Sequence, residues 1–147
     1  MKADVRMKKL REGAQAPTYG SDFAAGCDLY ACVEAGEVTI QPGQTVVIPT
    51  GWAMEIPDGF AGLIYARSGL ATKSGLAPAN KVGVVDSDYR GEVCVALYNH
   101  SGEVRVVKSG DRVAQMVITP YLTATFLETD DLTDTSRGAG GFGSTGK

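Results

Sequence analysis

Two polar segments of the sequence carry residue types that bind and hydrolyse phosphate compounds. Residues 66–70 (ARSGL) place a cation, a hydroxyl and a glycine where a predicted strand leads into a helical turn. Exposed amides and the dipole at the start of such a turn favour an anion. Residues 86–91 (DSDYRG) lie between two apolar runs, so we expect them to form the tip of a β-hairpin. A carboxylate at such a tip, Asp86, is suited to orient and deprotonate a water molecule.

Both segments also admit a structural interpretation. Ser68 would then only cap the helical turn, and Arg67 would be a surface charge. Turns attract aspartate in any case, although a turn does not require Tyr89 and Arg90 beside two carboxylates. The residues alone leave both alternatives open.

Two further polar residues lie within apolar segments. Asp28 is the one acid in residues 24–29, and a buried aspartate is rare without a partner, which suggests a cation or the water shell of one. A turn or a helix cap is the alternative. Gln115 lies inside a strand-like run, where it either joins such a site or faces solvent. His100 is the only histidine and lies in a polar turn, so we do not expect a Ser–His nucleophile.

The C-terminal residues 137–147 contain five glycines and one aromatic ring. This composition cannot bury enough apolar surface to fold alone, so we expect a mobile segment in the free chain. An arginine, two hydroxyls and a flat ring suit a ligand that carries both phosphate and a planar base. We interpret the segment as a lid that closes on a ligand, and idle disorder is the alternative.

The elements that must position these residues are predicted to be β-strands. Short runs rich in Val, Ile and Thr recur between turn residues, which is typical of an all-β sandwich or barrel, and one short helical turn is expected at 68–73. We predict a single β domain over 1–128 and a flexible linker with a glycine-rich lid over 129–147. The predicted strands are 38–40, 45–48, 52–56, 60–65, 93–98, 104–107, 112–119 and 123–127.

Length and charge narrow the class of protein. The chain has 147 residues and a net charge of −3, which argues against a nucleic-acid partner reached by bulk electrostatics. The sequence has no apolar run typical of a signal peptide or a membrane span, so we expect a cytoplasmic protein with no membrane partner. The three cysteines lack metal-site spacing and are expected to be reduced thiols. Fifteen residues separate Leu127 from Phe142, a reach of up to about 50 Å, enough to cover a neighbouring subunit.

Taken together and in order, five motifs resemble those of the trimeric dUTPase family. Cys27 departs from the aromatic residue expected between the glycine and the acid of the first motif, whereas Asp28 is intact. The five motifs are residues 25–29 (AGCDL), 67–71 (RSGLA), 83–91 (GVVDSDYRG), 110–115 (GDRVAQ) and 137–146 (RGAGGFGSTG).

This resemblance implies a jelly-roll-like β fold, a homotrimer with active sites shared between subunits, and hydrolysis of dUTP to dUMP and pyrophosphate. Asp86 would hold the attacking water as general base, and Mg²⁺ would be held through waters by Asp28 and Gln115. The residues that would bind the base and sugar are Asn80, Gly83, Val84, Val85, Asp86, Tyr89, Cys94 and Phe142. Those that would bind the phosphates are Arg67, Ser68, Gly69, Gln115, Arg137, Ser144 and Thr145.

Two rival functions differ at named positions. A dCTP deaminase, which resembles the same fold, is expected to have a second serine where Gly69 stands and no glycine–phenylalanine lid. A non-catalytic nucleotide-sensing module that binds other proteins is expected to have lost Asp86 or the C-terminal segment, and this sequence retains both.

Overall fold

Alternating apolar residues create the long strands of the fold. Val93, Val95 and Leu97 are buried along strand β9, while the residues between them face the other way and are half-buried. The computed structural model describes residues 3–141, which form one helix and a set of strands. The strands are β1 (Arg6–Lys9), β2 (Thr18–Tyr19), β3 (Cys27–Tyr30), β4 (Glu37–Ile40), β5 (Thr45–Glu55), β6 (Phe60–Tyr65), β7 (Leu76–Pro78), β8 (Gly83–Val85), β9 (Glu92–Asn99), β10 (Arg105–Lys108) and β11 (Arg112–Pro120); the helix is α1 (Ser68–Ser74).

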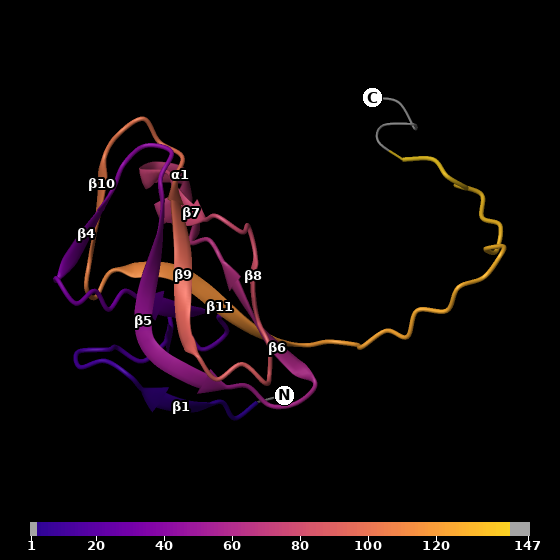
Figure 1. Cartoon of the computed structure of the whole chain (residues 1–147), viewed down its shortest axis with the longest axis horizontal. Coiled ribbons are helices and arrows are strands. Elements are labelled where there is room, and N and C mark those ends of the chain that lie inside the picture. Colours follow the sequence, from indigo (N-terminus) through magenta and orange to yellow (C-terminus); the bar gives the residue numbers. More distant parts are fainter. Residues whose placement is uncertain (1–2, 142–147) are drawn as a thin grey trace.

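Three antiparallel sheets make up the molecule (Figure 1). The larger two have the strand orders β1-β5-β9-β7 and β2-β3-β11-β6-β8, and a ribbon of β10 and β4 extends beside them. None of the described sheets closes on itself. The all-β prediction is therefore confirmed, in the form of a sandwich and not of a closed barrel.

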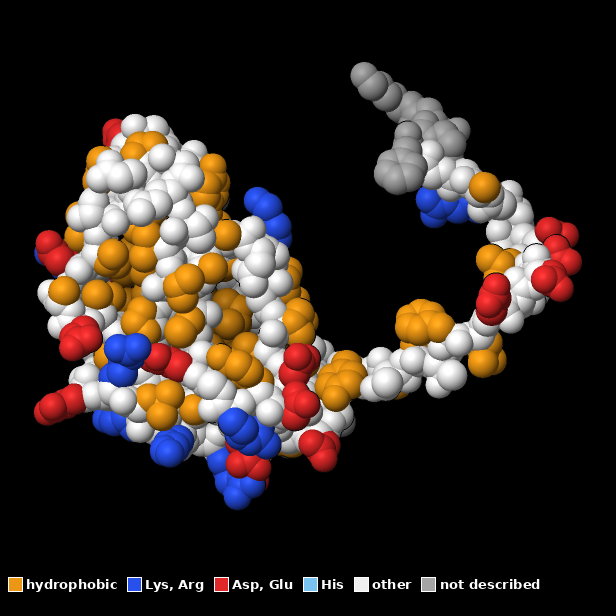
Figure 2. All heavy atoms as spheres, viewed as in Figure 1, with side chains coloured by type: hydrophobic (Ala, Val, Ile, Leu, Met, Phe, Trp, Pro, Cys, Tyr) orange, Lys and Arg blue, Asp and Glu red, His pale blue; other side chains and the backbone are white. Residues whose placement is uncertain are grey.

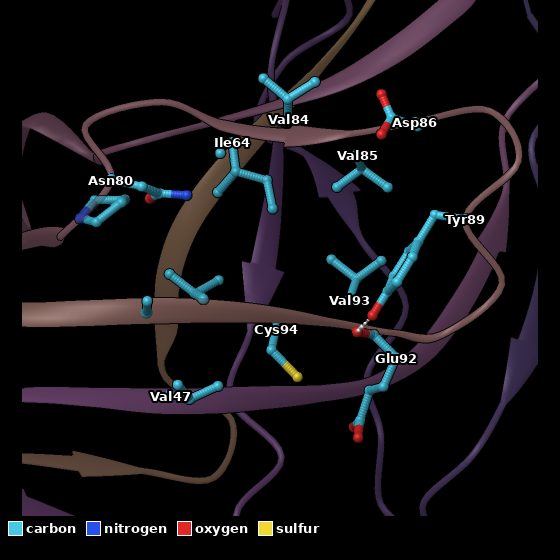
Figure 3. Close-up of a pocket in the computed structure, with 14 residues that line it drawn as sticks. Val47, Ile64, Asn80, Val84, Val85, Asp86, Tyr89, Glu92, Val93 and Cys94 are labelled. Atoms are coloured by element: carbon cyan, nitrogen blue, oxygen red, sulfur yellow. Dashed lines mark hydrogen bonds between the residues drawn. The ribbon is translucent and has the colours of Figure 1, made fainter.

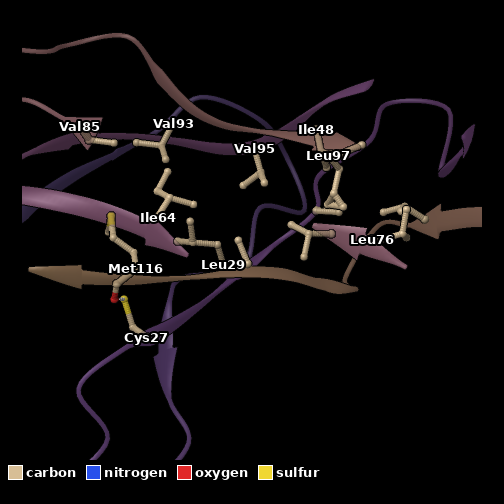
Figure 4. Packing of buried hydrophobic residues seen from close by; sticks show 14 of the residues in the cluster. Cys27, Leu29, Ile48, Ile64, Leu76, Val85, Val93, Val95, Leu97 and Met116 are labelled. Atoms are coloured by element: carbon tan, nitrogen blue, oxygen red, sulfur yellow. Dashed lines mark hydrogen bonds between the residues drawn. The ribbon is translucent and has the colours of Figure 1, made fainter. Parts of the chain in front are cut away.

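The hydrophobic core lies between the two larger sheets. Val93 and Val95 of β9 project toward Leu29, Ile64 and Met116 of the opposite sheet (Figure 4). Each of these five side chains is at most 5% exposed. Burial of apolar area on this scale is the main favourable term in folding, and it fixes the spacing of the sheets that carry the polar motifs.

The chain passes from one large sheet to the other through residues 86–91. Strand β8 pairs with β6, where Val85 lies opposite Gly62, whereas β9 pairs with β5 and β7. The predicted β-hairpin at this place is therefore wrong, because its two flanking strands belong to different sheets. The predicted turn is present, and the Tyr89 amide donates to the Asp86 carbonyl at 3.2 Å.

The predicted strand at 123–127 is also wrong, because this segment has no neighbouring strand. The last strand ends at Pro120, and the chain then leaves the body of the fold (Figure 1). Leu122 is 97% exposed and Phe126 93% exposed. The apolar composition of this segment suggested a strand, but no strand of the described chain pairs with it. The proposed boundary between 128 and 129 stays a prediction.

Candidate active site

The crossing at 86–91 borders a pocket of about 420 Å³ between β8 and β9 (Figure 3). It contains every predicted base- and sugar-binding residue that lies within the described part of the chain. These lining residues are Asn80, Gly83, Val84, Val85, Asp86, Tyr89 and Cys94. Sequence reasoning missed Val47 and Glu92, which also line the pocket. Val47 lies on β5, far from this stretch in the sequence, and Glu92 follows the last residue of the third motif.

Tyr89 leans across the crossing and is held at its hydroxyl. Its Oη donates to the carbonyl oxygen of Glu92 at 3.0 Å, so the ring spans from the turn to the start of β9 (Figure 3). Gly91 leaves space for the ring, because a Cβ there would lie 2.6 Å from the ring Cζ. The ring is 45% exposed, so one part of it is available to a ligand.

Asp86 follows β8 directly and is exposed at the rim of the pocket. Its carboxylate makes no hydrogen bond with another residue of the described chain, so its oxygens are available to a water molecule. The geometry therefore places an acceptor for a proton at one end of an otherwise largely apolar pocket.

The other end of the pocket is shaped by the backbone around Asn80. The turn bends tightly, since the amide of Val82 donates to the Asn80 carbonyl at 2.7 Å and Lys81 has a φ of 66°. Gly83 packs closely here, because a Cβ would lie 3.2 Å from both Asn80 Nδ2 and Ile64 Cβ. This end is suited to a flat group that approaches the backbone closely.

Cys94 contributes a thiol to the pocket wall from the outward face of β9. Burial raises the pKa of this thiol, and the nearby Glu92 carboxylate raises it further. The protonated thiol is therefore the form present near neutral pH, and it contributes a small, weakly polar surface. In the structure Cys27, Cys32 and Cys94 are all free, as expected.

A second polar group lies where β3, β11 and the start of α1 meet. Asp28 Oδ1 accepts from Arg67 Nε at 2.7 Å, and Asp28 Oδ2 accepts from Arg112 Nη1 at 3.3 Å. Asp28 therefore lies in a strand with two cationic partners, which contradicts the turn or helix cap kept as its alternative. Sequence reasoning missed Arg112, although it stands inside the fourth motif.

Gln115 completes this group through strand pairing. It lies opposite Asp28 of β3 on one side and opposite Tyr65 of β6 on the other. Its Nε2 donates to the carbonyl oxygen of Ala66 at 2.9 Å, and a Cβ at Gly26 would lie 2.8 Å from its Oε1. The side chain is therefore directed into the group. The alternative interpretation, in which Gln115 faces solvent, is wrong.

Ser68 and Gly69 begin helix α1 beside this group. The N-cap is Arg67, and no side chain caps the helix, so the cap proposed as an alternative for Ser68 is wrong. Gly69 borders open space, since nothing lies within 4 Å of a Cβ built there. Gly75 ends the helix with a φ of 67°, a left-handed backbone that glycine adopts without strain.

The described part of the C-terminal segment, residues 137–141, meets neither group in this structure. Arg137 Nε donates to the carbonyl oxygen of Gly140 at 2.8 Å, and both residues lie outside the body of the fold (Figure 1). Phe142, Ser144 and Thr145 lie outside the described residues. The structure thus forms two separate groups, the residues predicted to bind the base and the group of Asp28, Arg67 and Gln115, and residues 137–141 join neither.

The two groups lie toward opposite ends of strand β6. Asp86 follows Val85, which pairs with Gly62 near the start of β6, whereas Arg67 comes after the end of that strand. Five or six residues of extended chain at about 3.3 Å each separate the two places by about 15–20 Å. None of Asp28, Arg67 and Gln115 lines the base pocket.

Within residues 3–141, no three His, Cys, Asp or Glu side chains gather closely enough to enclose a metal ion. The oxygen donors that are present, a carboxylate and a side-chain amide, are the type that Mg²⁺ accepts, and this ion usually retains several of its waters. The donor set therefore fits Mg²⁺ held through water. Among the same described residues, α1 is the only helix, and with seven residues it is too short to cross a membrane.

Comparison with known proteins covers nearly the whole chain. The family model described as dUTPase matches residues 12–146. The chain is 50% identical over 147 residues to the deoxyuridine 5'-triphosphate nucleotidohydrolase of Desulfitobacterium hafniense (strain DSM 10664 / DCB-2), covering 99% of this chain and 97% of the relative. It is 49% identical over 140 residues to the protein of that name from Hahella chejuensis (strain KCTC 2396), covering 95% of this chain and 91% of the relative.

Solved structures agree in fold. The dUTPase of Staphylococcus bacteriophage 80alpha with dUPNHPP superposes with a TM-score of 0.84 at 27% identity, covering 98% of this chain and 99% of that one. A mutant dUTPase from phage phi11 of S. aureus, in which the coordination of a structural Mg(II) ion is described, gives a TM-score of 0.78 at 25% identity and covers 87% of this chain and 97% of that one. The jelly-roll-like β fold is shown by this likeness.

Proposed function

The chain belongs to the dUTPase family and hydrolyses dUTP to dUMP and pyrophosphate, and we propose that Asp86 is the general base of this reaction. The observation that carries the proposal is the pocket at the crossing, which gathers every described base- and sugar-binding residue around an exposed carboxylate. In it, uracil would lie against the backbone between Asn80 and Val85. Tyr89 would lie beneath the deoxyribose and leave no room for a 2′-hydroxyl.

The proposed reaction is an in-line displacement at the α-phosphorus. A water held by the Asp86 carboxylate loses a proton to it as the oxygen attacks, and pyrophosphate leaves. Phosphoryl transfer depends on alignment and charge neutralisation more than on covalent help. This requirement fits a site that has arginines, hydroxyls and glycine amides and no histidine.

The phosphates are proposed to bind at Arg67, Ser68, Gly69 and Gln115. Arg67 uses Nε to bind Asp28, and its terminal nitrogens make no hydrogen bond within the described chain, so they can donate to a phosphate. Mg²⁺ is the proposed cofactor, held through waters by Asp28 and Gln115. When bound, it would neutralise charge on the triphosphate.

We propose that each active site is shared between subunits of a homotrimer. About 15–20 Å of strand separates Asp86 from Arg67 in one chain, whereas a general base acts on its proton directly or through one water. The phosphate group of one copy would therefore serve the base pocket of another. Hydrophobic side chains also gather over β5 and β9 on the outer face of the molecule (Figure 2), and Val47 there is 62% exposed, as expected of a surface that packs on a second copy.

The C-terminal segment is the proposed lid. Phe142 would stack on uracil, and Arg137, Ser144 and Thr145 would bind the distal phosphates. The lid would close on the substrate of a neighbouring subunit and open to release dUMP and pyrophosphate.

One experiment tests the substrate and the mechanism together. The protein is incubated with Mg²⁺ and, in turn, each deoxynucleoside triphosphate and UTP, and release of pyrophosphate is measured. Rapid release from dUTP alone is expected. Release from dCTP or UTP at the same rate would overturn the proposed base and sugar recognition, and ammonia released from dCTP would indicate the deaminase instead.

A further inference from the structure

Glu92 connects the sugar-facing tyrosine to two segments far away in the sequence. It begins β9 directly after the crossing, and its backbone carbonyl accepts the hydroxyl of Tyr89 at 3.0 Å. Its carboxylate points away from Tyr89 (Figure 3), and its side chain is 18% exposed. The residue thus joins the wall of the base pocket to structure outside the pocket.

The carboxylate of Glu92 accepts three hydrogen bonds, two from one guanidinium and one from a backbone amide. Arg11 Nε donates to Oε1 at 2.7 Å, Arg11 Nη2 donates to Oε2 at 2.9 Å, and the Gly51 amide donates to Oε1 at 2.8 Å. A paired arginine fork of this kind fixes direction as well as distance. The Glu92 side chain therefore has one orientation, which also limits the movement of its backbone carbonyl.

The two donors to Glu92 are themselves fixed in place. Gly51 has a φ of 80° at the point where the pairing of β5 with β9 shifts register, and a Cβ there would lie 2.5 Å from Ala14 Cβ. The Leu10 amide donates to the Gly51 carbonyl at 2.8 Å, which holds the segment that carries Arg11 beside the same irregularity. The Arg11 guanidinium and the Gly51 amide together form the binding site of the Glu92 carboxylate, which we call its seat.

We propose that Glu92 and Arg11 are positioning residues for Tyr89, and that through it they set the discrimination between deoxyribose and ribose. This inference rests on the proposed role of Tyr89 beneath the sugar. A ring excludes a 2′-hydroxyl only if it cannot move aside by the size of one oxygen atom. Tyr89 is exposed along one side, so its position depends on the hydroxyl bond to Glu92 and hence on the seat that holds Glu92.

Charge supports the same arrangement. The Arg11 guanidinium is the main cause of a lowered pKa at Glu92, so the carboxylate is ionised throughout the neutral range. Glu92 has no place in the proposed chemistry, and its carboxylate faces Arg11 and the Gly51 amide. Its role in activity would thus be to hold another residue and not to contact the reacting atoms.

The test separates sugar discrimination from turnover. Glu92→Gln keeps the shape of the side chain but weakens the paired interaction, and Arg11→Met removes it from the other side. In each variant we expect the ratio of kcat/KM for dUTP to that for UTP to fall by about tenfold, the low end of what a misfitted group costs. In Arg11→Met, whose altered residue lies outside the pocket, the kcat for dUTP should stay within about threefold of the parent protein, because Asp86 is untouched. Lys9→Met is the matched control, since it removes from the same segment a cation that lies over the Trp52 ring, 5.5 Å from its centroid, and makes no ion pair with Glu92.

A double-mutant cycle distinguishes positioning from a general loss of stability. Tyr89→Phe keeps the ring and removes the hydroxyl that binds Glu92. If Glu92 acts through that bond, adding Glu92→Gln to Tyr89→Phe lowers the ratio no further. Additive effects, or an unchanged ratio in both Glu92→Gln and Arg11→Met, would overturn the inference.

Failure of the proposed function gives a different result. In that case the parent protein itself would not prefer dUTP to UTP, or Tyr89→Ala, which removes the ring, would leave the preference unchanged; a preference lost in Tyr89→Ala but kept in Tyr89→Phe would overturn the inference alone. If Glu92→Gln does not fold, Arg11→Met and Arg11→Lys still decide the question. Arg11→Lys retains the charge but not the fork, so recovery of part of the ratio is expected.

Discussion

Gly91→Ala tests how tightly Tyr89 is held. A Cβ at position 91 would lie 2.6 Å from Tyr89 Cζ and 3.0 Å from Cε2, and closer still to the hydroxyl. Carbon atoms in contact are separated by about 3.5–4.0 Å, so the ring must move by about 1 Å. The bond from Tyr89 Oη to the Glu92 carbonyl, now 3.0 Å, would then exceed hydrogen-bond length.

The movement has two measurable consequences of different size. Loss of one partly exposed hydrogen bond lowers the free energy of unfolding by about 0.5–1.5 kcal/mol, so the variant stays folded. A displacement of about 1 Å in a positioning group lowers kcat/KM by as much as about 100-fold. We therefore expect the ratio of kcat/KM for dUTP to that for UTP to fall by about tenfold or more while the protein stays stable.

Steady-state pyrophosphate release with both nucleotides, together with thermal unfolding, measures these two effects. Gly102→Ala is the matched control, because its backbone lies outside the left-handed region and nothing lies within 4 Å of the added Cβ. The reasoning is refuted if Gly91→Ala and Gly102→Ala have the same dUTP preference. It is also refuted if the loss in Gly91→Ala is entirely explained by unfolded protein.

Four further outcomes are expected. Asp86→Asn should retain nucleotide affinity but lower kcat by about 10²- to 10⁴-fold, the usual contribution of a general base, and near-normal turnover would remove Asp86 from that role. Truncation before Arg137 should leave a folded assembly of unchanged size with little activity, and full activity would show that the segment is dispensable. Gly62→Ala should lower the free energy of unfolding by about 1–3 kcal/mol in chemical denaturation, because its Cβ would lie 2.8 and 2.9 Å from side-chain atoms of two core residues, while Gly20→Ala should change it little. Glu92→Gln should be less stable than the parent protein near neutral pH. Because the folded-state pKa of Glu92 is lowered, the difference in the free energy of unfolding is present above the ordinary pKa of 4.5 and shrinks as the pH falls through the folded-state pKa. Unfolding curves of both proteins at several pH values would show this.

Local patterns predicted the features that depend on local sequence. The apolar run at residues 93–98 identified β9, and the run at 60–65 matches β6 at both ends. The residues predicted to bind the base also line one pocket, because most of them lie in one continuous stretch around the crossing. The strand expected at 123–127 is the exception, because its apolar composition has no neighbouring strand in the described chain.

Features that depend on strand partners were beyond the sequence. The apolar runs on either side of 86–91 have the same pattern whether they pair with each other or join different sheets, so a hairpin was expected where the chain crosses between sheets. The pairing of Asp28 with Arg67 and Arg112 requires the registers of β3 and β11. The contact of Arg11 with Glu92 joins residues 81 positions apart, and none of the five motifs predicts it.

The group around Asp28 would explain how a chain of net charge −3 can present the proposed phosphate site. Two guanidinium groups, of Arg67 and Arg112, surround one carboxylate, so the group carries one net positive charge where it lies. The Asp28 side chain is 14% exposed and contacts both arginines, with the shorter contact, 2.7 Å, to the partly buried Arg67, so less side-chain entropy would be lost if a phosphate binds there. Removing Asp28 would add positive charge but release both arginines, and their orientation matters more than the charge for a bidentate contact. A chain that is acidic overall can therefore bind a polyanion through a local, preoriented cationic group, which long-range attraction would not supply.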